Sequence, residues 1–182
     1  MFFIDFIVPF IKMIRNNSIQ KELHLNDDFR KQNKSQLDRI FHPLNEKITF
    51  KINQNFRELT KNKKEEEKII KTKGRIFKIS KYFAGITRFK FNDLCDVNLG
   101  SEDYINIAKL CDHIFIEDIP IFNDNNSNQQ LRFVILIDIF YEKKISLTIS
   151  LAKDLFNLGS SNKHSEVFKR TRSRLFEMTK IK

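Results

Sequence analysis

The sequence predicts an α/β fold with a short parallel βαβ core, flanking helices and a small antiparallel β arm. Three observations support this fold class. Two short apolar runs rich in β-branched residues, 113–117 and 145–150, have the length and composition of buried strands. An apolar segment of helical length, about 131–142, lies between them. A strand, a crossover helix and a second strand make a parallel pair, whose sheet needs helices on both faces.

The segment between the two runs follows the polar stretch NDNNSNQQ, which predicts a loop, and ends at Lys143 and Lys144. Two positive charges suit the C-terminal end of a helix. A continuous apolar run such as FVILIDIFY carries no periodicity of its own and is also compatible with a strand. Its length and its flanking residues favour the helix.

The first residues have apolar side chains at spacings of three and four over 2–14, which predicts an amphipathic helix. This stretch is too short to cross a membrane and carries Asp5, Pro9 and Lys12. It has neither the basic start nor the small-residue cleavage site of a signal peptide. We therefore expect neither a membrane span nor a signal there. An edge strand over 19–25 and an acidic turn at 27–30 follow.

A weak element over 37–44 ends at Pro43, and the apolar stripe of 48–59 predicts a helix, although ITFKI also alternates as a strand does. The segments 69–73, 75–80 and 86–91 predict a small antiparallel unit with turns at 73–74 and 84–85. Ser101 is expected to cap a helix that runs to Cys111. A further element over 151–158 ends at Gly159, and the last helix covers 166–179.

These elements divide the chain into three predicted parts. They are a helical, lid-like segment over 1–60, a basic antiparallel β arm over 61–91, and an α/β unit with a C-terminal helix over 92–182. The chain has a net charge of +10, and residues 61–90 hold 11 Lys and Arg against 3 Glu. A basic surface attracts polyanions such as nucleic acid; the alternative is an ordinary solvated hairpin.

Cysteine usage points to a reducing compartment and to no metal site. Cys95 and Cys111 are the only cysteines, and they form no paired metal-ligand spacing. The sequence Cys111-Asp112-His113 offers two close zinc ligands but no second pair. We therefore expect a cytoplasmic protein, with a mitochondrial one as the alternative.

A set of ordered motifs resembles the ZapE family, AAA+-type ATPases that include bacterial cell-division protein ZapE and mitochondrial relatives. The family pattern Phe-x-x-Leu-Cys, Leu-Gly and Asp-Tyr lies at 91–104 of this sequence. The resemblance continues at Ile119-Pro120, Arg132-Phe133, Leu136-Ile137-Asp138, Tyr141-Glu142 and the run from Phe168 to Met178. It covers nearly the whole chain and implies the C-terminal portion of an AAA+-type P-loop ATPase. Leu131 and Phe29 depart from the family pattern, which has Arg and Tyr there.

Enzymes of this class hold triphosphate with a G-x-x-x-x-G-K-[ST] loop and magnesium with an acidic pair at a strand end. None of the four glycines here precedes a lysine. The resemblance therefore implies ATP and Mg²⁺ as cofactors of the complete enzyme, but we expect this chain alone to bind neither and to hydrolyse no ATP. Its partners would be a missing P-loop half or further copies of the chain, together with cell-division or client proteins.

Arg170 and Arg174 are the candidate catalytic residues. The resemblance places them in a motif-rich helix, where they would sense phosphate or act as arginine fingers. The alternative is an exposed ladder with Glu166 and Glu177. Arg132 is a candidate nucleotide-binding residue, or else a surface arginine that covers apolar neighbours.

Two further acidic sites have structural interpretations. The pair Glu117-Asp118 imitates a magnesium-binding pair, but it has no P-loop to serve. Asp138, inside an apolar helix, is expected to be paired or exposed to solvent. No metal ligands are predicted.

Two other functions stay open: a non-catalytic protein-interaction module, and a weak nucleic-acid binder that uses residues 61–90. That stretch has no reading helix and no evident stacking platform, so sequence-specific nucleic-acid binding is not expected.

Overall fold

The computed structural model describes residues 39–180, together with positions 13 and 16. Apart from position 13, the helix expected over 2–14 lies outside the described residues, and so do the edge strand over 19–25 and the acidic turn at 27–30.

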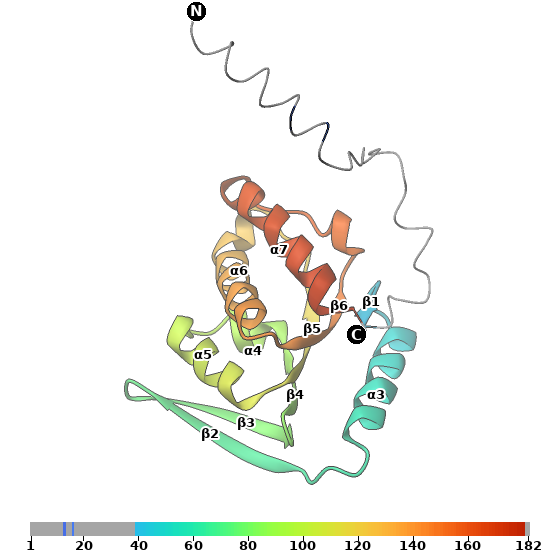
Figure 1. Cartoon of the computed structure of the whole chain (residues 1–182), viewed down its shortest axis with the longest axis vertical. Helices are drawn as coiled ribbons and strands as arrows, with labels where there is room; N and C mark the ends of the chain where they lie inside the picture. The colour runs from blue at the N-terminus through green and yellow to red at the C-terminus, as the bar shows by residue number, and fades with distance from the viewer. Residues whose placement is uncertain (1–12, 14–15, 17–38, 181–182) are drawn as a thin grey trace, which may run out of the picture. The chain divides into compact units, whose positions relative to one another are not determined.

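A six-stranded sheet forms the centre of the described part, in the order β1-β6-β5-β4-β3-β2 (Figure 1). The strands β1, β6, β5 and β4 are parallel, whereas β4, β3 and β2 are antiparallel. Their bounds are β1 Ile40–Phe41, β2 Glu66–Thr72, β3 Arg75–Phe83, β4 Ile86–Lys90, β5 His113–Ile119 and β6 Ser146–Leu151. The predicted α/β class is confirmed.

The predicted βαβ unit is present as β5, the crossover helix α6 (Ser127–Glu142) and β6, which pairs in parallel with β5. The apolar run is therefore helical and not a strand. The helix begins earlier than the sequence predicts, inside the polar stretch expected to be a loop. Gln130 accounts for this, because its buried side chain donates to Ser160 Oγ (2.7 Å) and accepts from the Ser161 amide (2.9 Å).

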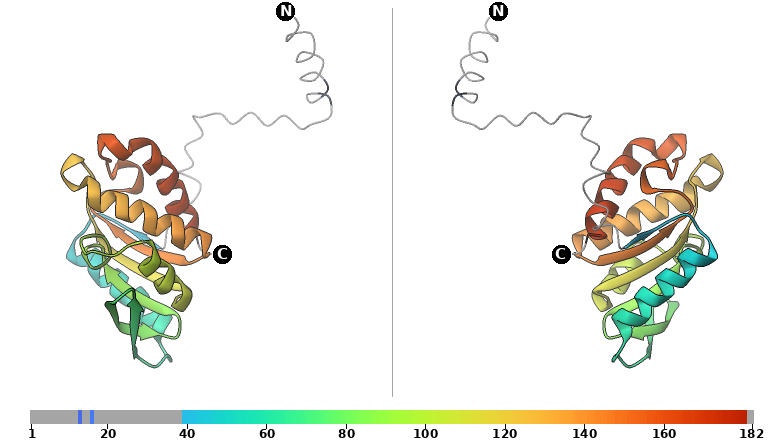
Figure 2. Two further views of the ribbon diagram at one scale, coloured as in Figure 1. Left: turned by 90° about the vertical axis from the view of Figure 1, so that its left-hand side faces the viewer. Right: turned by 90° about the vertical axis from the view of Figure 1, so that its right-hand side faces the viewer.

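Helices cover both faces of the sheet, as a parallel sheet requires (Figures 1 and 2). On one face α3 (Glu46–Thr60) packs Ile52 and Phe56 against Ile86 and Phe115. The opposite face of the sheet, which includes Ile114 and Ile116 of β5, belongs to the main hydrophobic core. The helices in that core are α4 Phe91–Cys95, α5 Ser101–Leu110, α6 and α7 Ser165–Met178.

Helix starts show one correction. Asn45 caps α3 by accepting the Ile48 amide at 2.9 Å, which fixes 46–60 as helix and not strand. Ser101, expected to be a cap, is instead the first residue of α5. The start of α5 is held instead by the Asp103 carboxylate, which accepts hydrogen bonds from the Gly100 amide at 2.9 Å and from the Arg75 guanidinium at 2.7 Å.

The expected antiparallel unit is formed by β2, β3 and β4, joined by turns at 73–74 and 84–85. In each turn both central residues have positive φ, at 46° and 79° in the first and 44° and 86° in the second. That is the geometry of the tight hairpin turn that matches strand twist. Because β4 also pairs with β5, these strands continue the central sheet. The division at residues 60 and 91 stays a prediction.

None of the helices in the described part combines the length and apolar character that a membrane crossing requires.

His113 lies buried at the start of β5 and shares a hydrogen bond of 2.8 Å with the Thr148 hydroxyl. Its ring lies 5.1 Å from the Phe115 ring. Burial in this apolar site, with a smaller contribution from the positive charges of Arg39 and Lys63, lowers the pKa of His113 to about 4. The folded protein therefore keeps this imidazole neutral.

We predict that stability falls as pH drops from about 6.5 to 4, because in this window the unfolded chain binds a proton at His113 that the folded chain does not. The contribution present above pH 6.5 and lost by pH 4 is about 3 kcal/mol. Urea unfolding measured at several pH values across this range gives the free energy of unfolding as a function of pH. This free energy should fall less steeply with decreasing pH for His113→Asn than for the wild type. Parallel profiles would contradict this assignment.

Candidate functional site

Arg170 and Arg174 come together on α7 around one carboxylate, Asp138 of α6. Arg170 Nη2 lies 2.9 Å from Asp138 Oδ2, and Arg174 Nη1 donates to Asp138 Oδ1. The Asp138 side chain is 30% exposed, whereas Arg170 is 57% and Arg174 only 20% exposed. The two candidate arginines thus share one anchor, and Asp138 is paired as expected.

The ladder with Glu166 and Glu177, the alternative for these arginines, is not what the described residues form. Glu166 pairs with Lys169 at 2.7 Å, and Glu177 accepts the Tyr141 hydroxyl at 2.8 Å. That hydrogen bond raises the pKa of Tyr141. The Arg174 guanidinium lies 4.8 Å from the centre of the Tyr141 ring, a cation–π contact. Arg174 is therefore packed between α6 and α7, while Arg170 keeps an accessible guanidinium.

Arg132, the candidate nucleotide-binding residue, does not join this cluster. Its Nη1 donates to the Cys95 carbonyl at 3.1 Å, at the end of α4. Arg132 and Asp138 are six residues apart on α6, about 9 Å along the axis and on different sides of the helix. The structure thus places Arg132 against α4 and the arginine pair against α7.

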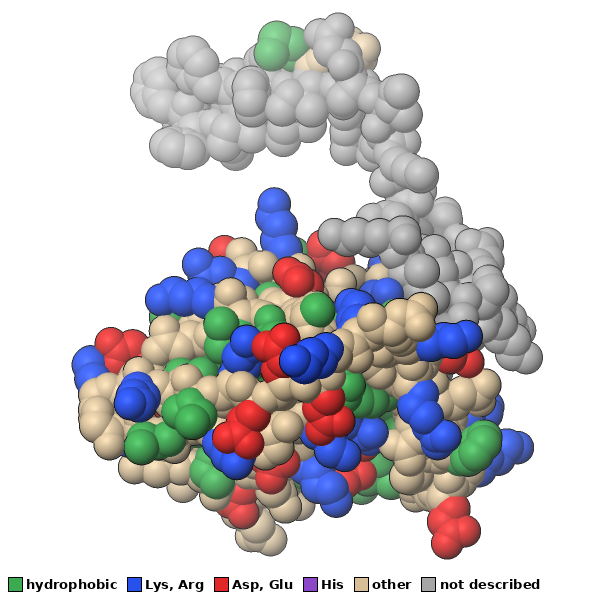
Figure 3. All heavy atoms as spheres, turned by 90° about the horizontal axis from the view of Figure 1, so that it is seen from below, with side chains coloured by type: hydrophobic (Ala, Val, Ile, Leu, Met, Phe, Trp, Pro, Cys, Tyr) green, Lys and Arg blue, Asp and Glu red, His purple; other side chains and the backbone are tan. Residues whose placement is uncertain are grey.

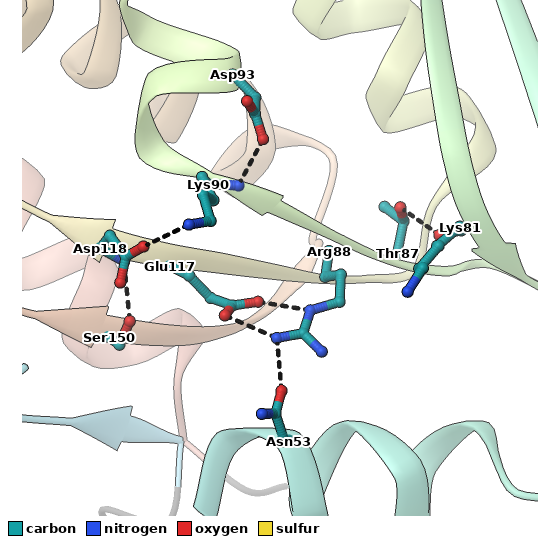
Figure 4. Close-up of polar contacts among 9 residues, drawn as sticks. All are labelled: Asn53, Lys81, Thr87, Arg88, Lys90, Asp93, Glu117, Asp118 and Ser150. Atoms are coloured by element: carbon teal, nitrogen blue, oxygen red, sulfur yellow. Dashed lines mark hydrogen bonds and ion pairs between the residues drawn. The ribbon is translucent and has the colours of Figure 1, made fainter. Parts of the chain in front are cut away.

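A second polar cluster lies at the carboxyl ends of the parallel strands β4 and β5 (Figure 4). Arg88 donates to both oxygens of Glu117, at 2.6 and 2.7 Å, and to Asn53 Oδ1 of α3 at 2.9 Å. Its guanidinium also lies 4.8 Å from the centre of the Phe56 ring. The Glu117 side chain is only 11% exposed. This ion pair joins two strands to the helix that covers them.

Asp118, the next residue, has a positive φ of 62°, and its backbone amide donates a hydrogen bond of 2.9 Å to Ser150 Oγ of β6 (Figure 4). Its carboxylate lies 3.5 Å from Lys90 Nζ. Because Arg88 occupies both Glu117 oxygens, this acidic pair does not fit the magnesium-binding role that its position imitates. Among the described residues, no group of three or more His, Cys, Asp and Glu could hold a metal ion.

The cysteines do not form a site either. Cys95 and Cys111 are both free and buried, and burial raises the pKa of Cys111 to about 12. Such thiols are protonated and unreactive near neutral pH. The ring of His113 bonds with Thr148 instead of turning to Cys111.

Much of the charge of the basic stretch 61–90 is paired. Six of its 11 cations have a carboxylate partner: Lys68, Lys73, Arg75, Lys78, Arg88 and Lys90. On the face seen from below, Lys and Arg side chains are interspersed with acidic and hydrophobic ones (Figure 3). This arrangement gives a less concentrated positive field than the sequence count suggests.

Sequence reasoning missed Arg88 and Asn53 as partners of Glu117. Arg88 lies 29 residues and Asn53 lies 64 residues before Glu117 in the chain. The signal available was that Glu117 ends an otherwise apolar strand, so a buried cation had to face it. Which cation does so depends on the parallel pairing of β4 with β5, which the antiparallel pattern of 69–91 does not reveal.

A family model described as AFG1-like ATPase matches residues 4–182. The chain is 28% identical over 145 residues to "Lactation elevated protein 1 homolog B" of Danio rerio, covering 78% of this chain and 29% of that protein. It is 30% identical over 88 residues to "Cell division protein ZapE" of Escherichia coli (strain K12), covering 48% of this chain and 24% of that protein. The matches thus span less than a third of either relative. No solved structure matches the chain. The family resemblance predicted from the motifs is confirmed.

We predict that Arg88→Ala lowers the free energy of unfolding by about 3 kcal/mol, because it leaves the largely buried Glu117 carboxylate without its cation. Lys90→Ala is the matched control on the same strand. Its ion pair with Asp118 is 3.5 Å long and well exposed, so its loss should cost under ~1 kcal/mol. Urea unfolding at pH 7 measures both. If both variants lost the same free energy of unfolding, the Arg88–Glu117 pair would contribute no more to stability than the exposed Lys90–Asp118 pair.

Proposed function

Because this chain belongs to the AFG1-like ATPase family, we propose that it supplies the arginine-bearing C-terminal part of a nucleotide-dependent ATPase. The P-loop of that enzyme would come from residues outside this sequence, on the same polypeptide or on a partner. The similarity to cell division protein ZapE of E. coli supports a role in cell division, with protein quality control as the alternative. ATP and Mg²⁺ would be cofactors of the complete enzyme.

We do not expect these residues to form a nucleotide site by themselves. None of the four glycines precedes a lysine, so a P-loop cradle is missing from these 182 residues. Glu117 is engaged by Arg88 and Asp118 lies near Lys90. What the chain offers is a pair of guanidiniums in fixed geometry.

The arrangement of Arg170, Asp138 and Arg174 carries the proposal. A guanidinium can bind two phosphate oxygens at once, and it does so best when its orientation is already fixed. Asp138 holds both arginines, and the contact with Tyr141 restrains Arg174 further. Arg170, the more exposed of the two, is then the residue that contacts an anion, and Arg174 is a positioning residue for α7.

The free, buried cysteines support a reducing compartment. We propose a cytoplasmic location, with a mitochondrial one as the alternative.

The first prediction of this proposal concerns residues 1–182 alone. Titration calorimetry with Mg²⁺ and ATP should show no saturable heat, since no glycine of the sequence is followed by the lysine that a P-loop requires. Micromolar binding would show that these residues form a nucleotide site by themselves.

The second prediction concerns the complete enzyme, obtained by fusing this chain to the part of E. coli ZapE that precedes the aligned region. In the fusion, Arg170→Ala should lower ATP turnover about 10³-fold, as the loss of a charge-stabilising arginine does. Its melting temperature should stay unchanged, because an exposed ion pair contributes under ~1 kcal/mol. Arg174→Ala should lower both turnover and melting temperature, since Arg174 is packed against Tyr141.

Lys169→Ala, an equally exposed cation one residue away, is the control and should change neither quantity. Near-full turnover in the Arg170→Ala fusion would refute the phosphate-contacting role of Arg170. A fusion that melts cooperatively but shows no turnover would count against the proposal as a whole.

A further inference from the structure

A groove of about 650 Å³ lies where β3 separates from β4, apart from the arginine cluster of α7. The groove is lined by residues of β3, β4 and α4, by Val97 and by Glu117 of β5. Its volume is in the range of about 300–1,000 Å³ that is typical of small-ligand sites. Neither the family match nor the proposed function gives this groove a role.

The separation of the two strands follows from their pairing. β3 has nine residues and β4 has five, yet the two pair only at Tyr82–Thr87 and Phe83–Ile86. From Arg88 to Lys90, β4 continues its ladder with β5 on its other side. In the same way, β3 pairs with β2 over 75–79, and on the side that faces the groove these residues pair with no other strand of the described part of the chain. Two strand edges with unpaired backbone groups therefore face each other.

A β-bulge coincides with the fork. Glu66 pairs with Tyr82 and Lys68 with Ile79, so Ser80 and Lys81 of β3 stand opposite the single residue Glu67. A bulge bends its strand and increases the local twist, which turns β3 away from β4. The Thr87 hydroxyl donates to the Lys81 carbonyl at 2.9 Å and fixes the fork at its closed end (Figure 4). The opening is thus built into the strand and is held at a defined place.

The chemistry of the groove selects an extended segment with acidic side chains. The partly exposed Phe77 and the exposed Val97 give it apolar surface, whereas Phe89 is buried. Lys78 and Lys90 are ion-paired with Glu67 and Asp118, so the uncompensated positive charge of the lining comes from Lys81. The two acidic lining residues are both engaged, Glu117 with Arg88 and Asp93 with the Lys90 amide. Lys81 has no ion-pair partner among the described residues. An added strand alternates its side chains, so one set can meet the apolar surface while the other meets the lysines.

Single-stranded nucleic acid suits the groove less well. It would need exposed aromatic rings on which bases stack. Phe89 is buried at 7% exposure, and Phe77 packs against it with ring centres 5.8 Å apart. In addition, the unpaired backbone groups of two facing strand edges form a regular row of hydrogen bonds with a peptide backbone, and a nucleic acid has no such backbone.

We propose that the fork between β3 and β4 is a docking site for an extended, acidic segment of a partner protein, which binds as an added β-strand. The binding mode is strand addition, in which main-chain hydrogen bonds supply affinity and alternate side chains supply selectivity.

The test uses residues 1–182 and a fluorescein-labelled eight-residue peptide in which Glu alternates with Val or Thr, followed by fluorescence anisotropy at physiological salt. We expect saturable binding at least about 10-fold tighter than that of the same peptide with Lys in place of Glu. A version with alternate backbone amides N-methylated keeps the charge but loses donors, and it should also bind at least about 10-fold more weakly.

Lys81→Glu should weaken binding of the acidic peptide at least about 10-fold, and the milder Lys81→Gln should weaken it less. Lys71→Glu is the matched control, because Lys71 is an exposed lysine of β2 outside the groove and makes the same change of charge. Thermal melting verifies that all variants are folded. Absence of binding, equal losses for Lys81→Glu and Lys71→Glu, unchanged binding of the N-methylated peptide, or tighter binding of a labelled oligothymidine would each overturn the proposal.

Discussion

The burial of β5 on both faces is the constraint on which the rest of the structure depends. All of His113–Ile119 is buried except Asp118, so each face of this strand needs its own layer of helices. α3 covers the face that includes Phe115, and the helices of the main core cover the other. The polar residues of β5 are therefore confined to its two ends, where His113 meets Thr148 and Glu117 meets Arg88.

The two ends of β5 solve the problem of buried polarity differently. At the start, His113 stays neutral and shares a hydrogen bond, so no charge has to be compensated. At the end, Glu117 is compensated by Arg88, and Asn53 completes the contact from α3. Because Arg88 donates to both carboxylate oxygens of Glu117, these oxygens are not free to coordinate a metal ion. A position that is catalytic in many α/β proteins is here part of the scaffold.

The surface features that remain available lie away from this core. Arg170 is an exposed residue of α7, and the fork lies between β3 and β4, in the antiparallel part of the sheet. Both are built from residues whose neighbours are fixed: Asp138 for the arginine, and Thr87 with the Ser80–Lys81 bulge for the fork. Accessible groups whose positions are already fixed favour binding, because less conformational entropy is lost when a partner binds.

The sequence by itself determined the α/β class, the βαβ core, the hairpin turns and the family. Local signals suffice for these, since strand composition, helix length, turn glycines and ordered motifs are properties of contiguous residues. It also singled out Arg170, Arg174 and Asp138, but not that one carboxylate holds both arginines. Only the tertiary structure decided that α6 starts at Ser127, that Arg88 serves Glu117, and that β3 leaves β4 at Lys81. Each of these depends on residues about 30 positions apart meeting across strands or helices, or on a bulge, and no local pattern encodes such a meeting.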